Sequence, residues 1–201
     1  MYYYSYENLK RISKTEKGKQ IIQQAKEIYE KEYADKPILA LKYSLYKLYE
    51  HNGNRNKFEA MYFERRKRLH LLQLLAVAEE EYFEALEDVL SAICDEFTWV
   101  LPAHAQRHPI DLFAAETSFY LAETAYIFDS KLTAGILTRI KKSIEEKIVK
   151  VFENNRFNWE KNSSNWSAVC ACGVGVSYLY FFPERFNLVK DRIFKDFETY
   201  L

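Results

Sequence analysis

The sequence predicts an all-α protein whose helices lie in two layers. Apolar residues recur at helical spacing along almost the whole of the 201 residues, and no stretch alternates convincingly as a strand does. Glycine and proline are scarce, at five and four residues, so we expect long helices with few tight turns. Two helical segments that are apolar nearly all round are each followed by an amphipathic one, as expected when inner helices are buried and outer helices are half exposed.

The first half of the chain contains four predicted helices. Thr15 to Tyr33 is amphipathic, and a second helix from Ile38 to Tyr49 follows Pro37. The turn His51 to Asn54 separates it from a long helix at about Arg55 to Val77. The fourth helix has glutamates on one face, and its other face carries Tyr82, Phe83, Leu86, Val89, Leu90 and Ile93.

The second half alternates between buried and half-exposed helices. Asp111 is the expected N-cap of a helix that reaches Phe128 and is apolar nearly all round. The apolar stripe at 137–151 has a charged back, the segment from Trp166 to Phe182 carries no charge, and 186–201 is again amphipathic. This alternation favours an α/α barrel or an incomplete α/α toroid over a four-helix bundle, in a single domain over residues 1–201.

Composition excludes some classes of partner. Lys plus Arg equals Asp plus Glu, with 29 of each, so no overall field attracts nucleic acid or an anionic membrane. The start of the chain has no apolar core typical of a secretory signal, and three cysteines indicate free thiols in a reducing compartment, so we expect a cytoplasmic protein. The aromatic content of 16% suits either a packed core or a cleft that stacks on sugars.

The segment Glu96 to Pro109 is long for a connection between helices, and such connections are usually functional. It contains Trp99, His104, Arg107 and His108. A histidine beside an arginine suits the binding of carboxylate or sulfate groups. The alternative is that Trp99 fills the core and the histidines cap helix ends.

A second group of polar and aromatic residues precedes the uncharged helix. Asn162 and Asn165 lie there beside Trp159 and Trp166. An amide at the mouth of a buried helix serves either as its cap or as a hydrogen-bond donor to a substrate carboxylate. If the amide binds a substrate carboxylate, the two tryptophans nearby indicate a sugar site.

Metal and nucleic-acid sites are poorly supported. His104 and His108 are four apart, but Ala, Gln and Arg stand between them, and Cys170 and Cys172 lack the usual chelating spacing. We therefore expect no metal and no cofactor. The basic run Arg65 to Arg68 is short and isolated, and we interpret it as a solvated helix face.

Four stretches occur in order between roughly Phe58 and Tyr180: FEAMYFERRKRL, ICDEFTWVLPAH, IDLFAAETSFYLAE and NWSAVCACGV. Together they resemble the N-terminal α/α-toroid domain of heparinase II/III-like polysaccharide lyases. The resemblance implies β-elimination on uronic-acid polysaccharides such as heparan sulfate or alginate. In that chemistry one group neutralises the uronate carboxylate, a base removes the C5 proton, and a tyrosine protonates the leaving oxygen.

The resemblance carries over to few positions. Asn165 matches the neutralising residue, whereas Trp166 stands where well-known members have histidine, so His104 is expected to contribute from the neighbouring loop. No tyrosine matches the catalytic one by motif, and the β-sandwich domain that closes the cleft is expected to be absent.

The resulting expectation is an anionic polysaccharide or oligosaccharide as partner. Its sugars would stack on Trp99, Trp159 and Trp166, its carboxylates would meet His104, Arg107 and Asn165, and His108 and Asn162 would add polar contacts. The alternatives are a non-catalytic carbohydrate-binding module and a structural helical protein, with a homodimer covering the open edge of the toroid.

Overall fold

The computed structural model describes residues 5–106, 108–161 and 163–200. Within these ranges every regular element is helical, which confirms the all-α class. The α-helices are α1 (Tyr6–Ser13), α2 (Glu16–Glu32), α3 (Tyr43–Tyr46), α4 (Leu48–Asn52), α5 (Asn56–Ala78), α6 (Phe83–Cys94), α7 (Leu112–Ile127), α8 (Ala134–Ile144), α9 (Lys150–Asn154), α10 (Asn165–Phe181) and α11 (Pro183–Tyr200). Short 3-10 turns lie at Glu80–Tyr82 and Asn158–Lys161, and a π-turn at Glu145–Val149 joins α8 to α9. No helix in the described ranges is long and apolar enough to cross a membrane.

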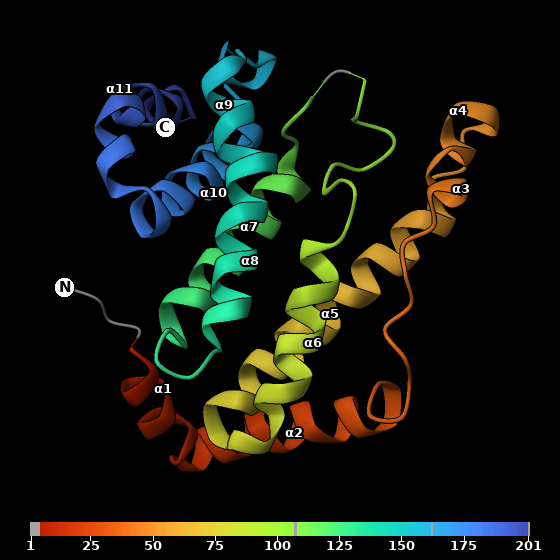
Figure 1. Cartoon of the computed structure of the whole chain (residues 1–201), viewed down its shortest axis with the longest axis vertical. Coiled ribbons are helices and arrows are strands. Elements are labelled where there is room, and N and C mark those ends of the chain that lie inside the picture. The colour runs from red at the N-terminus through yellow and green to blue at the C-terminus, as the bar shows by residue number, and fades with distance from the viewer. Residues whose placement is uncertain (1–4, 107, 162, 201) are drawn as a thin grey trace.

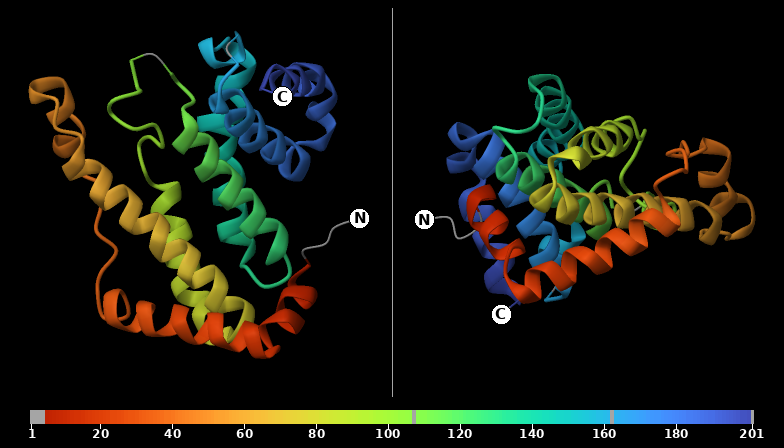
Figure 2. Two further views of the ribbon diagram at one scale, coloured as in Figure 1. Left: turned by 180° about the vertical axis from the view of Figure 1, so that it is seen from behind. Right: turned by 90° about the horizontal axis from the view of Figure 1, so that it is seen from below.

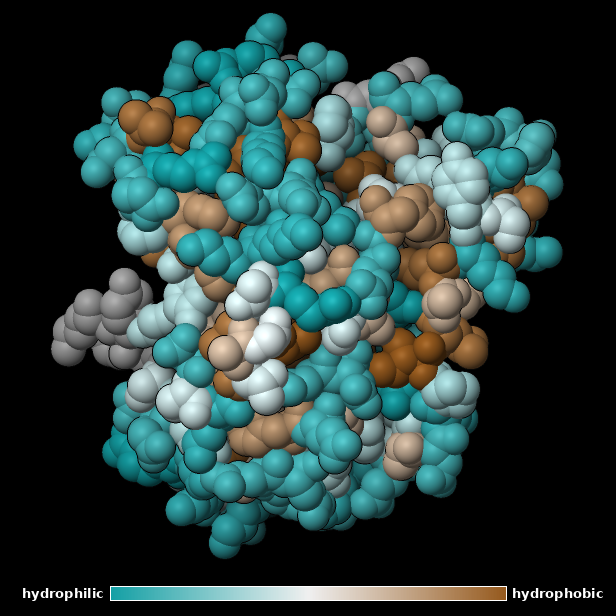
Figure 3. Space-filling view, viewed as in Figure 1, coloured by the Kyte–Doolittle hydropathy of each residue, from teal (hydrophilic) through white to brown (hydrophobic). Residues whose placement is uncertain are grey.

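The helices form two layers. In Figure 1, α6, α8 and α9 lie in front of α5, α7 and α10, and the view from below in Figure 2 separates the same two sets. The helix α2 crosses one end of the molecule and packs on α5, while α11 packs on α10. Figure 3 shows that the front face is mainly hydrophilic, with several hydrophobic patches, one of them at its right-hand edge. Closure of these layers into a toroid stays a prediction.

The rear helices α7 and α10 are the two that the sequence predicts to be buried. No residue of α7 is exposed, and α10 exposes only Asn165 and Leu179. The two helices approach closely at Gly173, where a Cβ atom would lie 2.2 Å from the carbonyl oxygen of Ala115. Glycine is therefore needed at this contact, and the prediction of buried helices is confirmed.

The predicted helix from Ile38 to Tyr49 is correct only from Tyr43 on, where two short helices stand in place of one. Residues 37–42 form no regular helix, and the short helices α3 and α4 follow, ending at Gly53 with a left-handed φ of 72°. The carbonyl of Lys36 accepts a hydrogen bond of 2.9 Å from Arg68, and the carbonyl of Leu39 accepts one from Arg65. These carbonyl groups therefore accept hydrogen bonds from buried arginines rather than from main-chain N–H groups of a helix.

The interpretation of Arg65 to Arg68 as a solvated face is also wrong. Arg65, Arg66 and Arg68 are buried, and only Lys67 is exposed. Glu96, 4% exposed, accepts hydrogen bonds from both Arg65 and Arg66, with Arg65 Nη1 at 2.8 Å and Arg66 Nη2 at 2.6 Å. Buried charges need such partners, and this carboxylate joins α5 to the residues that follow α6.

A tyrosine extends this buried polar cluster. The hydroxyl of Tyr62 lies 3.0 Å from the carbonyl oxygen of Trp99, 3.1 Å from that of Phe113 and 2.8 Å from Thr117 Oγ1. The guanidinium of Arg66 lies 3.5 Å from the centre of the Tyr62 ring. Because Trp99 lies in the segment between α6 and α7 and Phe113 lies in the first turn of α7, Tyr62 ties this segment to the start of α7.

Replacement of Glu96 by glutamine leaves two buried guanidiniums without their anion, so Glu96→Gln is expected to lower the free energy of unfolding by about 3–5 kcal/mol. Urea denaturation measures this loss. The matched control is Glu32→Gln, which removes the exposed pair with Lys67 and is expected to cost less than about 1 kcal/mol. Equal losses in the two variants would show that Glu96 has no special structural role.

Candidate functional site

Two of the predicted sugar-stacking tryptophans are buried. Trp99 and Trp159 are each 1% exposed. Their indole N–H groups donate to main-chain carbonyls, Trp99 to Ile93 at 3.0 Å and Trp159 to Ile110 at 3.1 Å. Protein covers their ring faces, so neither ring is open to a sugar in this structure. This is the packing role that the sequence left as the alternative for Trp99.

Arg107 and Asn162, both predicted to bind substrate, lie outside the described residues. The other predicted residues lie in the α6–α7 connection (residues 95–111) and at the start of α10, which the structure brings together.

His104 is held by a buried carboxylate. Its Nδ1 lies 2.8 Å from Asp111 Oδ2, and its side chain is 21% exposed. Asp111 is fully buried and also accepts hydrogen bonds from the backbone N–H of Leu101 at 3.1 Å and of Ala114 at 2.7 Å. The bond to Ala114 makes Asp111 the N-cap of α7, as predicted. With Nδ1 bonded to Asp111, His104 has Nε2 for proton transfer.

Trp166, at the start of α10, contacts the two histidines of the α6–α7 connection. Its ring centre lies 5.1 Å from that of His104 and 4.8 Å from that of His108. Trp166 is half-buried, unlike the other two tryptophans, and the exposed Asn165 precedes it as the first residue of α10. Ser164 occupies the N-cap position, so the Asn165 side chain is not the cap that the sequence left as its alternative role.

The cluster of His104, His108 and Trp166 adjoins a cavity between α5 and α7, because His104 contacts Phe113, which lines that cavity. The His104 ring stacks on Phe113 at a centroid distance of 6.0 Å, and Phe113 contacts Phe63 at 5.3 Å. Phe113 and Phe63 line a cavity of about 370 Å³, here called the α5–α7 groove. Its wall also includes Lys67, His70, Glu116 and Tyr120. In the rear view of Figure 2, α5 and α7 run side by side, and the α6–α7 connection lies at the end where they diverge.

Sequence reasoning missed the groove, although one signal was present. The helix α7 is uncharged except for Glu116 and Glu123, which are seven residues apart and therefore share one face. Charged residues at regular spacing on an otherwise buried helix indicate a face that lines a cavity. Glu116 lines the α5–α7 groove, and Glu123 lines a second cavity.

Burial is the main influence on the pKa of Glu116. It raises the pKa of the carboxyl group, and the nearby charge of Asp111 raises it further. Among the described residues Glu116 has no ion-pair partner. Carboxyl groups with perturbed pKa values in a cleft are frequent at functional sites, because stability alone would not retain them.

The described residues contain no cluster of three or more histidine, cysteine or acidic side chains that could hold a metal ion. Cys94, Cys170 and Cys172 form no disulfide bond within the part of the chain that the structure describes. Cys170 is fully buried within α10.

No protein-family model matches the chain, and no curated protein matches its sequence. The resemblance to polysaccharide lyases therefore rests on the residues quoted above.

Glu116→Gln is expected to stabilise the protein at neutral pH. The raised pKa means that the folded state disfavours the ionised carboxylate, so stability is retained below the ordinary glutamate pKa of about 4.3 and falls as the pH rises through the raised value. Thermal unfolding should therefore show a higher Tm than wild type at pH 7 and a much smaller difference near pH 4. The exposed Glu146 provides the control Glu146→Gln, for which no such pH-dependent gain is expected. A Glu116→Gln variant that is less stable at pH 7 would contradict this account.

Proposed function

We propose that the chain binds an acidic oligosaccharide that contains uronic acid, along the surface formed by His104, His108, Trp166 and the α5–α7 groove. One observation supports this most. His104 is positioned by Asp111 and contacts the half-exposed Trp166 at one end of the aromatic groove.

The chemistry of this surface suits such a ligand. Aromatic faces stack on sugar rings, and Trp166, Phe63 and Tyr120 supply them. Imidazole and amide groups bind carboxylates, and His104, His108 and Asn165 supply these at one end. Glu116 accepts hydrogen bonds from sugar hydroxyls at a point further along the groove.

A second function, β-elimination on the same ligand, is favoured by the His104–Asp111 pair. Here His104 Nε2 takes the C5 proton while Asn165 neutralises the sugar carboxylate. The electrons of the C–H bond form the C4=C5 double bond, the C4–O bond breaks, and the leaving oxygen takes up a proton. Glu116, with its raised pKa, is the carboxylic acid in the groove suited to donate that proton.

Calorimetric titration with tetrasaccharides from alginate and heparan sulfate, and with a neutral cello-oligosaccharide, tests the binding proposal. The acidic ligands should bind more tightly than the neutral one. Trp166→Ala and His104→Ala should each weaken the acidic ligands by about tenfold or more, since a stacked or paired side chain contributes roughly 1.4 kcal/mol. The control is Phe194→Ala, which removes an exposed aromatic ring of α11 and should change nothing.

Ultraviolet absorbance of a 4,5-unsaturated uronate in the same samples separates the two functions. A rise that Asn165→Ala and His104→Ala abolish would identify a lyase. Binding without a rise would identify a non-catalytic binding module. Equal affinity for acidic and neutral sugars, or no binding by a folded sample, would contradict the proposal.

A further inference from the structure

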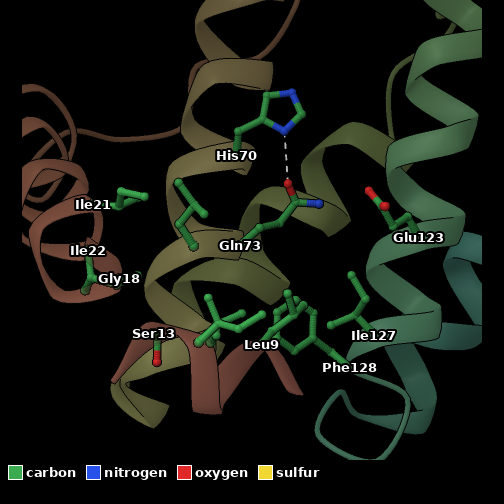
Figure 4. A pocket seen from close by; sticks show the side chains of 13 residues that line it. Leu9, Ser13, Gly18, Ile21, Ile22, His70, Gln73, Glu123, Ile127 and Phe128 are labelled. Atoms are coloured by element: carbon green, nitrogen blue, oxygen red, sulfur yellow. Dashed lines mark hydrogen bonds between the residues drawn. The ribbon is translucent and has the colours of Figure 1, made fainter. Parts of the chain in front are cut away.

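A second cavity, of about 440 Å³, lies where α1 and α2 meet α5 and α7 (Figure 4). Its wall is mainly apolar, and its main apolar contributors are Leu9, Ile12, Ile21, Ile22, Leu74 and Ile127. Ile12 and Ile21 are 52% and 44% exposed, so part of this apolar wall faces solvent. The volume falls within the range of typical small-molecule sites, about 300–1,000 Å³.

Three polar side chains lie together at one end of this cavity. His70 and Gln73 extend from α5, and Glu123 extends toward them from α7, as the upper part of Figure 4 shows. His70 Nδ1 lies 2.9 Å from Gln73 Oε1, and the Gln73 amide donates to Thr124. The polar groups of Gln73 are therefore already engaged within the protein.

Glu123 differs from its two neighbours. No hydrogen bond or ion pair to the Glu123 side chain occurs among the described parts of the chain, and burial raises the pKa of its carboxyl group. No lysine or arginine lines the cavity. A half-buried carboxylate is costly without a partner, and a ligand that carries a positive charge would supply one.

We propose that this cavity binds a small amphipathic amine, with its ammonium group at Glu123 and its alkyl chain against the isoleucine and leucine side chains. Charge decides between this ligand and a fatty acid. A carboxylate ligand would meet Glu123 with no lining lysine or arginine to offset the repulsion. An uncharged alcohol would fill the apolar part but leave the Glu123 charge unpaired. This site borders the proposed sugar-binding surface, since His70 and Leu74 line both cavities, but Glu123 and the isoleucines of α1 and α2 belong to the second cavity alone.

Titration of the full chain at pH 7 with decylamine, decanol and decanoate, each below its aggregation limit, tests this proposal. Decylamine is expected to bind at least about tenfold more tightly than decanoate, which corresponds to a single ion pair in a partly buried site. Glu123→Gln should remove this preference, so that decylamine and decanol then bind alike.

A second variant tests the apolar wall. Ile21→Asn changes a half-exposed side chain, so the fold should persist, and it should weaken all three ligands. The matched control is Leu188→Asn, which makes the same kind of change at an exposed residue of α11 and should leave binding unaltered. Circular dichroism confirms that each variant is folded. Decanoate binding as tight as that of decylamine, or an amine preference that survives Glu123→Gln, would overturn the proposal.

Discussion

The pairing of buried Glu96 with Arg65 and Arg66 is the interaction on which the arrangement of the site depends. It holds the beginning of the α6–α7 connection against the middle of α5. Tyr62, one turn earlier on α5, contacts the carbonyls of Trp99 and Phe113. Asp111 then binds Leu101 and His104 from the end of the connection. A long segment with little secondary structure is thus held by polar contacts along its length, which places His104 beside Trp166.

The helix α7 links the two cavities. It packs closely against α10 at Gly173, and a neighbouring face of α7 carries Glu116 and Glu123, two turns apart. Burial raises the pKa of both carboxyl groups, and each lies in a different setting, Glu116 among aromatic rings and Glu123 beside aliphatic side chains. The same helix therefore presents one kind of group to two chemically distinct surfaces. The ligands proposed for the two surfaces differ because of the neighbouring residues rather than because of the carboxyl groups themselves.

Periodicity predicted most helices, the burial of α7 and α10, and the cap at Asp111, because these depend on residues close together in sequence. Burial of Arg65 and Arg66 was not predictable in this way, since their partner Glu96 is 30 residues or more away in the chain. The three tryptophans also look alike in sequence. Only their packing separates Trp99 and Trp159, which are buried, from Trp166, which is half exposed. The α5–α7 groove likewise arises from contacts between helices, and a single helical pattern does not reveal it.

The most direct test of the sugar-binding surface is the NMR spectrum of the ¹⁵N-labelled indole groups during titration with an acidic oligosaccharide. The chain has three tryptophans, so each indole signal reports on one place. Binding at the proposed surface should shift the Trp166 signal, while those of Trp99 and Trp159 stay in place because both N–H groups are buried and hydrogen-bonded. Binding that leaves Trp166 unshifted would contradict the assignment of this surface.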